Sequence, residues 1–273
     1  MQNPQFLVQL HYNYVMPGTL VILPTYMEKD TLPVVLTKVL TQEVADILVI
    51  DDNSPDGTAQ IASDWASRSA RVHVMNRPGK LGLGTAYLAG FIWGLERGFD
   101  CFIEMDSDMS HNPLDLPRFL DEIEKGADLV IGSRYMRGTI SVVGWDFKRL
   151  ILSKFGNMYA STILGLDLSD ITSGYRAFSR RALEKIELGA IHSEGYAFQI
   201  EVAYMAWSSG LKIAELPIIF TERASGSSKM SKQIVREAVW LPWRLRLREM
   251  KNSFLRFSSA KAPEKNPGRR TEG

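Results

Sequence analysis

The stretch Phe102-Ile-Glu-Met-Asp106-Ser-Asp108 places two carboxylates two residues apart at the end of an apolar, strand-like run. In an extended chain, residues i and i+2 point to the same side, so Asp106 and Asp108 can converge on one hard cation. A hard cation held by few carboxylates commonly serves the phosphates of a substrate, which complete its octahedral coordination. Solvated loop carboxylates give the same Asp-x-Asp pattern, so the neighbouring segments must decide how this pair is interpreted.

Other apolar runs repeat this order of a strand, a polar turn and a helical pattern. The runs Thr19 to Leu23 and Ile47 to Ile50 predict buried strands of a parallel sheet. Further strands are expected at Arg71 to Asn76, Cys101 to Met105 and Leu129 to Gly132, and helices at Gly84 to Arg97 and Leu114 to Gly126. This β-α-β order predicts a single α/β domain with a mostly parallel central sheet and helices on both faces.

Parallel strands that are joined by right-handed crossovers bring their carboxyl ends to one edge of the sheet. We therefore expect the polar residues that follow these strands to meet at a single cleft: Tyr26, Glu28, Asp52, Asp106 and Asp108. The helix starts agree with this layout, since Pro33 suits a first helical turn and Thr58 can cap the helix after the second strand.

The composition agrees with one domain and limits the partners and the cellular compartment that can be expected. The 273-residue chain has a net charge of +1, which argues against a general nucleic-acid binder, so no nucleic-acid partner is expected. Cys101 is the single cysteine, so an intrachain disulfide is excluded and a reducing, cytosolic setting is expected. No run approaches the ~20 apolar residues of a membrane span, and Met1 to Tyr14 lacks the features of a signal peptide.

Five motifs occur in a fixed order along the chain. They are Val-Ile-Leu-Pro24-Thr-Tyr26-Met-Glu28, Val-Ile50-Asp-Asp52-Asn-Ser-Pro-Asp-Gly, Lys80-Leu-Gly82-Leu-Gly84-Thr-Ala, Met-Asp106-Ser-Asp108-Met-Ser-His-Asn-Pro113 and Gly132-Ser-Arg134-Tyr. Together they resemble the polyprenyl-phosphate (dolichyl-phosphate) mannose synthases, from about Thr19 to Trp240. The resemblance implies a GT-A fold and an inverting glycosyltransferase that moves mannose from GDP-mannose to a polyprenyl monophosphate.

The resemblance implies a nucleotide-sugar site along the polar edge of the sheet. The residues that it assigns to this site are Pro24, Tyr26, Glu28, Ile50, Asp52, Asp106, Ser107, Asp108, Arg134, Arg223 and Lys229. The first five would contact the base and ribose, the Ser107 backbone would lie near the ribose-phosphate, and the three cations would contact the phosphates. Strand-end packing is the alternative for Pro24 and Ile50, and a surface ion pair is the alternative for Arg134.

The resemblance also implies a divalent cation, Mg²⁺ or Mn²⁺, that Asp106 and Asp108 hold against the diphosphate. Some relatives carry Gln at the position of Ser110. The shorter serine would reach the metal directly or through a water molecule. Asp108, Arg149 and Ser153 are the residues expected to carry catalysis.

Arg149 and Ser153 are one helical turn apart, which places them on one face of a helix. The resemblance assigns both to the phosphate of the lipid acceptor, with Lys148 as an alternative for the charge and a solvated helix face as the alternative for the pair. The stretch Asp170 to Arg176 also matches the family near the acceptor side, and an ion pair between its two end residues is the alternative for Arg176.

A phosphate acceptor changes what catalysis requires. The second pKa of a phosphate monoester lies near ~6, so the acceptor is mostly a dianion at neutral pH and no catalytic base is needed. His73, His111 and His192 accordingly need no catalytic role. Transfer from UDP-glucose to the same kind of lipid is the alternative activity, and a noncatalytic nucleotide-binding scaffold is the alternative class.

Four segments are expected along the chain. Residues 1–17 form a loosely ordered extension, 18–230 the GT-A catalytic domain, 231–257 a basic amphipathic helical segment and 258–273 a disordered tail. The basic segment predicts peripheral contact with the cytoplasmic face of a membrane. Packing of Trp240 and Trp243 against the catalytic domain is the alternative, and Pro242 argues against one continuous helix. A membrane-bound partner protein is a further expectation.

Overall fold

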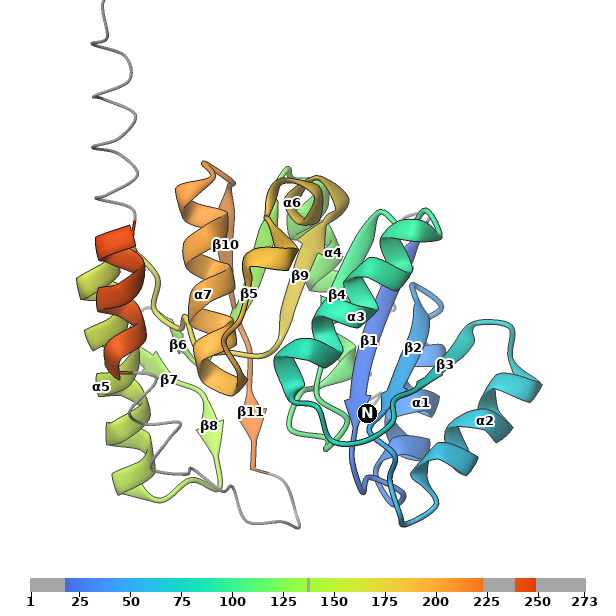
Figure 1. The fold of residues 1–273 in the computed structure, drawn as a ribbon. Coiled ribbons are helices and arrows are strands. Elements are labelled where there is room, and N and C mark those ends of the chain that lie inside the picture. The colour runs from blue at the N-terminus through green and yellow to red at the C-terminus, as the bar shows by residue number, and fades with distance from the viewer. Residues whose placement is uncertain (1–17, 137, 223–238, 249–273) are drawn as a thin grey trace, which may run out of the picture.

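The computed structural model describes residues 18–136, 138–222 and 239–248, with a seven-stranded sheet at its centre (Figure 1). The strand order is β10-β5-β9-β4-β1-β2-β3. The bounds are β1 (Thr19–Thr25), β2 (Asp46–Asp51), β3 (Val72–Asn76), β4 (Cys101–Glu104), β5 (Leu129–Ser133), β9 (Arg176–Ser179) and β10 (Ile213–Pro217). Neighbouring strands are parallel except that β9 runs antiparallel to β4 and β5. The expected mostly parallel α/β sheet is therefore confirmed.

Alternate side chains of the central strands enter two hydrophobic layers on opposite faces of the sheet. In β1, Val21 and Leu23 cluster with residues of α1 (Leu32–Leu40), α2 (Thr58–Arg68) and α4 (Leu116–Glu124). Leu20 and Ile22 cluster with residues of α3 (Leu83–Glu96), α6 (Arg180–Lys185) and α7 (Gly195–Ser208). This division follows from strand geometry, because successive side chains point to opposite faces.

Smaller elements follow the carboxyl end of β5. Two two-stranded sheets pair β6 (Tyr135–Met136) with β7 (Thr139–Ile140) and β8 (Val142–Val143) with β11 (Phe220–Thr221). Helix α5 (Phe147–Leu164) comes after β8, and the 3-10 helices are η1 (Pro113–Asp115) and η2 (Leu188–Ala190). Because β5 ends at the polar edge of the sheet, the segment from β6 to the start of α5 begins beside that edge.

The helical segment 239–248 packs beside α5 and α7 (Figure 1). Leu241 and Leu245 are buried in a cluster with residues of both helices, whereas Trp240 and Trp243 are 67% and 49% exposed. Leu241 and Leu245 therefore make the buried part of this contact. Trp243 also contacts the domain, because its Nε1 donates a hydrogen bond to the Tyr159 hydroxyl of α5 (3.0 Å). The segment is helical through Pro242.

One predicted helix start also needs correction. The N-cap of α2 is Gly57, in the left-handed conformation, and Thr58 is the first helical residue. The Thr58 hydroxyl instead accepts a hydrogen bond from the Glu28 amide (3.0 Å) and donates one to Asp56 (2.6 Å). It therefore ties the turn after β2 to the turn after β1.

No helix within the described residues is long and apolar enough to cross a bilayer. The expected extension at 1–17, the tail at 258–273 and the segment boundaries after residues 230 and 257 lie outside the described residues.

Candidate active site

The turns that follow β1, β2 and β4 are bonded to one another at the carboxyl edge of the sheet. The Asp52 amide donates to the carbonyl of Thr25 (3.1 Å), and the Ser107 hydroxyl donates to the carbonyl of Pro24 (2.9 Å). The parallel register explains this proximity, because it sets Pro24 opposite Ile50 and Ile22 opposite Glu104. The structure thus brings the residues that follow three different strands to one place.

The two aspartates after β2 have different roles. Asp51 is fully buried, and its carboxylate accepts hydrogen bonds from the Thr25 hydroxyl (3.0 Å), the Ser54 amide (2.8 Å) and the Ser54 hydroxyl (2.6 Å). These bonds shape the turn. Asp52 is also buried, but it faces Arg77, whose Nε lies 2.5 Å from its Oδ1. This ion pair holds the Asp52 carboxylate in place at the edge of the sheet.

Arg77 is a site residue that the sequence analysis missed. It is 8% exposed, and besides Asp52 it donates to the Thr85 hydroxyl (2.8 Å) and the Gly82 carbonyl (2.9 Å). Its bonds join the end of β2 to the start of α3. The available signal was its position directly after the third strand, where the other edge residues also lie.

The residues expected to contact the base and ribose differ in how exposed their side chains are. Tyr26 is 38% exposed, and Lys80 Nζ lies 4.3 Å from the centre of its ring. The Glu28 carboxylate accepts from the Thr31 hydroxyl (2.7 Å). Ile50 is fully buried among the residues beneath α3, which is the strand-end packing that the sequence left open.

The carboxylate pair lies in a tight loop after β4. The side chain of Asp106 is 34% exposed, and Asp108 is 8% exposed. Asp108 Oδ1 accepts from the Ser110 amide (2.9 Å), and Met109 between them has a positive φ of 67°. Ser110 Oγ is buried and has no hydrogen-bond partner within the described part of the chain. Two carboxylates beside an unsatisfied hydroxyl oxygen form a donor set that suits a hard divalent cation.

His111 supports this loop, although it was expected to have no catalytic role. Its Nδ1 accepts from the Asp106 amide (3.1 Å), and its ring stacks on Tyr175 at 4.8 Å. Burial lowers the pKa of His111 to about 4, while the charge of Asp108 opposes the shift. The ring is therefore neutral at neutral pH, and it positions Asp106 without carrying charge.

Arg134 forms a buried ion pair, not one at the surface. Its Nε lies 2.6 Å from Asp170 Oδ2 and its Nη2 lies 2.7 Å from Oδ1, and the two side chains are 5% and 0% exposed. Nη2 also donates to the Thr172 hydroxyl (2.8 Å). The alternative that Arg176 pairs with Asp170 is wrong. Arg176 instead donates to three backbone carbonyls, those of Ile171, Ser173 and Gln199.

Arg149 and Ser153 lie one turn apart on α5, as expected. The Arg149 amide is capped by the Asp146 carboxylate (2.9 Å), and its guanidinium lies over the ring of Trp145 at 4.3 Å and bonds to Glu222. The Ser153 hydroxyl accepts from the Tyr135 hydroxyl (2.8 Å). Glu222 was not anticipated from the sequence. Arg223 and Lys229 lie outside the described residues.

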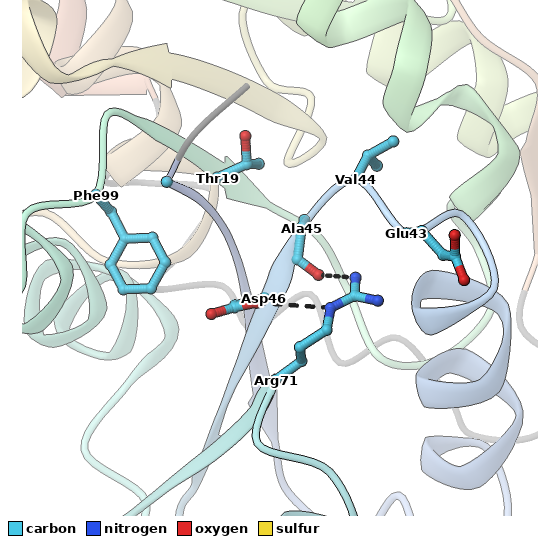
Figure 2. A pocket seen from close by; sticks show the side chains of 8 residues that line it. Thr19, Glu43, Val44, Ala45, Asp46, Arg71 and Phe99 are labelled. Carbon is cyan, nitrogen blue, oxygen red and sulfur yellow. Dashed lines mark hydrogen bonds and ion pairs between the residues drawn. The ribbon is translucent and has the colours of Figure 1, made fainter. Parts of the chain in front are cut away.

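A separate hollow of about 300 Å³ lies at the opposite, amino-terminal edge of the sheet, where Arg71 lines it with Thr19 and Asp46 (Figure 2). Arg71 donates to the carbonyls of Ala45 and Leu40 and lies 3.6 Å from Asp46. The Arg71 guanidinium is thus bonded to other residues that line the hollow. The hollow lies at the edge opposite the carboxylate pair, so we do not include it in the candidate active site.

Known proteins share both the sequence and the fold of this chain. Its residues 20–187 match the model of glycosyl transferase family 2. The polyprenol monophosphomannose synthase of Mycolicibacterium smegmatis is 50% identical over 224 residues, which cover 81% of this chain and 84% of that protein. The undecaprenyl-phosphate mannosyltransferase of Micrococcus luteus is 49% identical over 222 residues, covering 81% and 90%.

Solved structures agree at the level of the fold. Glucosyl-3-phosphoglycerate synthase from Mycobacterium tuberculosis, in complex with phosphoglyceric acid, superposes with a TM-score of 0.62 at 20% identity, over 84% of this chain and 79% of that one. The same enzyme with Mn²⁺, UDP-glucose and phosphoglyceric acid gives 0.60 at 21% identity, over 82% and 79%. The expected GT-A glycosyltransferase fold is thereby confirmed, and the chain belongs to glycosyl transferase family 2.

Proposed function

We propose that this enzyme transfers mannose from GDP-mannose to a polyprenyl monophosphate and forms a β-mannosyl phosphoryl polyprenol. The names of the two half-identical relatives support mannose transfer to a polyprenyl phosphate. The observation that carries the proposal is that two groups of polar residues lie near one edge of the sheet. A carboxylate pair follows β4, and the Arg149 and Ser153 pair lies on α5, which begins beside the same edge.

The donor would lie across the turns after β1, β2 and β4. Tyr26 offers an exposed ring for the base, and Asp52, fixed by Arg77, offers a carboxylate that can accept from base or ribose donors. Arg134 is proposed as a phosphate contact through Nη1, because its bonds to Asp170 and Thr172 use Nε and Nη2. Arg223 and Lys229 complete the proposed phosphate contacts.

Mg²⁺ or Mn²⁺ would be held by Asp106 and Asp108, with Ser110 as a third oxygen. Within the described residues no cluster of three or more His, Cys, Asp or Glu side chains is arranged to hold a metal. In this proposal the protein supplies the two carboxylates, and the diphosphate would supply further oxygens. When bound, the cation neutralises charge on the departing diphosphate.

In the transfer, an oxygen of the acceptor phosphate forms a bond to the anomeric carbon of mannose. The bond from that carbon to the diphosphate breaks, and its electron pair leaves with GDP. No proton has to be removed, because the acceptor oxygen is already ionised. Arg149 and Ser153 would hold the phosphate behind the anomeric carbon, so that proximity and charge compensation supply the acceleration.

A lipid acceptor requires contact with a membrane, and the surface of α5 supports such contact. Large apolar side chains are exposed along this helix and on the segment 239–248: Phe147, Leu152, Phe155, Met158, Trp240, Trp243 and Leu247. Exposed Arg244, Arg246 and Arg248 lie on the same segment. Apolar side chains among cations suit an anionic leaflet, so we place the enzyme peripherally on the cytoplasmic face, with a membrane-bound partner protein as a further candidate.

The first experiment is transfer of radiolabelled mannose from GDP-mannose to a short polyprenyl phosphate, with Mg²⁺ or Mn²⁺. Asp108→Ala should strongly reduce the amount of product, and Asp64→Ala, which removes an exposed carboxylate on α2, should not. A metal-dependent, acid-labile lipid product would support the proposal. Transfer from UDP-glucose alone would contradict GDP-mannose as the donor. Absence of transfer from both donors would contradict the proposed reaction.

A further inference from the structure

One hydroxyl of the proposed acceptor site is held by a hydroxyl from another element. Tyr135 Oη donates to Ser153 Oγ over 2.8 Å, which joins β6 to α5. Tyr135 is 7% exposed, whereas Ser153 is only partly buried. The tyrosine is thus a buried partner of a serine that a ligand can reach from solvent.

The bond to Tyr135 leaves the proton of Ser153 unused. A serine hydroxyl has one donor and two acceptor positions. On α2, for comparison, the Ser63 hydroxyl donates to the carbonyl of Ala59, one helical turn earlier (2.9 Å). Ser153 Oγ instead accepts from Tyr135 and donates to no other group within the part of the chain that the structure describes. Its proton is therefore available to an anion.

The Tyr135 hydroxyl is suited to donate this hydrogen bond. A phenol is more acidic than an aliphatic alcohol, so it is the better donor of the two and the poorer acceptor. Burial raises the pKa of Tyr135, and the charge of Arg134 opposes the shift. The phenol therefore keeps its proton at neutral and mildly alkaline pH. Because hydrogen bonds in a chain polarise one another, the bond from Tyr135 makes Ser153 a better donor to a phosphate oxygen.

Neighbouring segments hold both ends of this bond. Strand β6, which carries Tyr135, pairs with β7. On α5, the buried Asn157 donates through Nδ2 to the Ser153 carbonyl (3.0 Å). The same amide donates to the Thr172 hydroxyl and accepts from the Thr172 backbone (3.1 Å each), which ties α5 to the segment before β9. The place of the Ser153 side chain is thus set by more than its own helix.

We infer that Tyr135 is a positioning residue for the acceptor phosphate, which holds the Ser153 hydroxyl in one orientation and directs its proton to a phosphate oxygen. This inference rests on the proposed function, in which Arg149 and Ser153 bind that phosphate. Arg149 supplies the charge from one helical turn away, and Ser153 supplies a directed donor. Without the phenol, the Ser153 hydroxyl can turn to the Arg149 carbonyl one turn earlier, and its proton is then lost to the ligand.

The test removes one hydroxyl at a time. Binding of farnesyl phosphate to the full-length, GDP-loaded protein is measured by calorimetry at pH 8, where the phosphate is a dianion and Tyr135 is protonated. Tyr135→Phe should weaken binding about three- to tenfold, the effect of losing one neutral hydrogen bond. Tyr159→Phe is the matched control, because it removes a hydroxyl on α5 that donates to the Val239 carbonyl (3.0 Å). It should leave the affinity unchanged.

A double variant and a second ligand separate positioning from a general structural effect. In a Ser153→Ala background, Tyr135→Phe should cause no further loss of affinity, because no hydroxyl remains to be directed. The affinity for GDP should be unchanged in Tyr135→Phe, since a distorted β6 would also displace the adjacent Arg134, a proposed donor contact. Unchanged binding of farnesyl phosphate by Tyr135→Phe, the same loss in the Ser153→Ala background, or a parallel loss of GDP affinity would contradict the inference.

Mannose transfer by the same preparations distinguishes this inference from the proposed function. Transfer by the wild-type protein, together with normal farnesyl phosphate binding by Tyr135→Phe, would contradict the role of Tyr135 alone. The expected losses of binding, together with no mannose transfer by the wild-type protein, would contradict the proposed reaction and support the role of Tyr135. Failure of the wild-type protein to bind farnesyl phosphate would contradict both.

Discussion

The proposed donor side and the proposed acceptor side of this site differ in how deeply their ion pairs are buried. At the donor side, the Asp52–Arg77 pair has side chains that are 10% and 7% exposed, and the Arg134–Asp170 pair is buried still more completely. At the acceptor side, the Arg149–Glu222 pair is 27% and 38% exposed. Buried pairs resist separation, whereas exposed pairs exchange partners at small cost. The ion pairs of the donor side are thus fixed before a ligand binds, whereas Arg149 at the acceptor side can exchange Glu222 for another anion.

The structural elements around each side agree with this contrast between buried and exposed ion pairs. The turns of the donor side are joined across three strands of the central sheet, which lies between two hydrophobic layers. Helix α5 at the acceptor side presents Phe147, Leu152 and Phe155 to the outside. A nucleotide sugar can bind to a fixed edge, but a long lipid has to enter and leave through an open one. The following changes test this comparison.

The largest effect is expected at the most buried pair of the donor side. Asp170→Asn leaves the charge of Arg134 buried without its partner, which should lower the free energy of unfolding by about 3–5 kcal/mol. Chemical denaturation would measure the change. Glu184→Gln, at an exposed pair, should change it by less than about 1 kcal/mol. Equal, small losses in both variants would show that burial does not distinguish the two kinds of pair.

Asp108→Ala should reduce the rate of mannose transfer by about 10²–10³-fold, which is the usual cost of removing one group that stabilises charge at a reacting centre. The fold should remain, since this carboxylate accepts a local hydrogen bond from the Ser110 amide within the same loop. Transfer rate and circular dichroism are measured together. Full activity in a folded variant would contradict the placement of the donor diphosphate at this loop.

Much of the fold was predictable because local patterns determined it. The apolar runs, their polar turns and the β-α-β order predicted the ends of β1 to β5 to within a few residues of the observed ends. Strand β9 was not predicted. It has four residues, and its pairing with β4 and β5 depends on tertiary packing, which leaves no periodicity in so short a segment.

The site was predictable where its residues follow strands, and not where partners come from distant parts of the chain. Asp106 and Asp108 were found from their spacing after one strand. Arg77 is 25 positions from Asp52, and Glu222 is 73 positions from Arg149, so neither pair produces a local pattern. The same separation explains why the sequence offered only Arg176 as an alternative partner for Asp170, since its actual partner Arg134 lies 36 positions away.

At the acceptor side, Arg149→Ala should raise the KM for polyprenyl phosphate about tenfold, the effect of losing one charge-assisted contact of about 1.4 kcal/mol. The affinity for GDP should be nearly unchanged, because in the part of the chain that the structure describes Arg149 contacts Trp145, Asp146 and Glu222. Acceptor kinetics and GDP titration measure the two quantities. Equal loss of both would mean that the donor and acceptor sides are not separate.

The smallest effect is expected where the acceptor side meets lipid. Phe155→Ser and Trp240→Ser each remove an exposed apolar side chain, so they should weaken binding to anionic vesicles about three- to tenfold with little change in stability. Leu245→Ser is the matched contrast, because this leucine is buried against α5 and α7 and its loss should destabilise the packing of 239–248. Vesicle sedimentation and thermal unfolding separate the two outcomes. If the exposed and buried variants behave alike, the apolar face of α5 is a packing surface, and the contrast between a fixed donor side and an open acceptor side is lost.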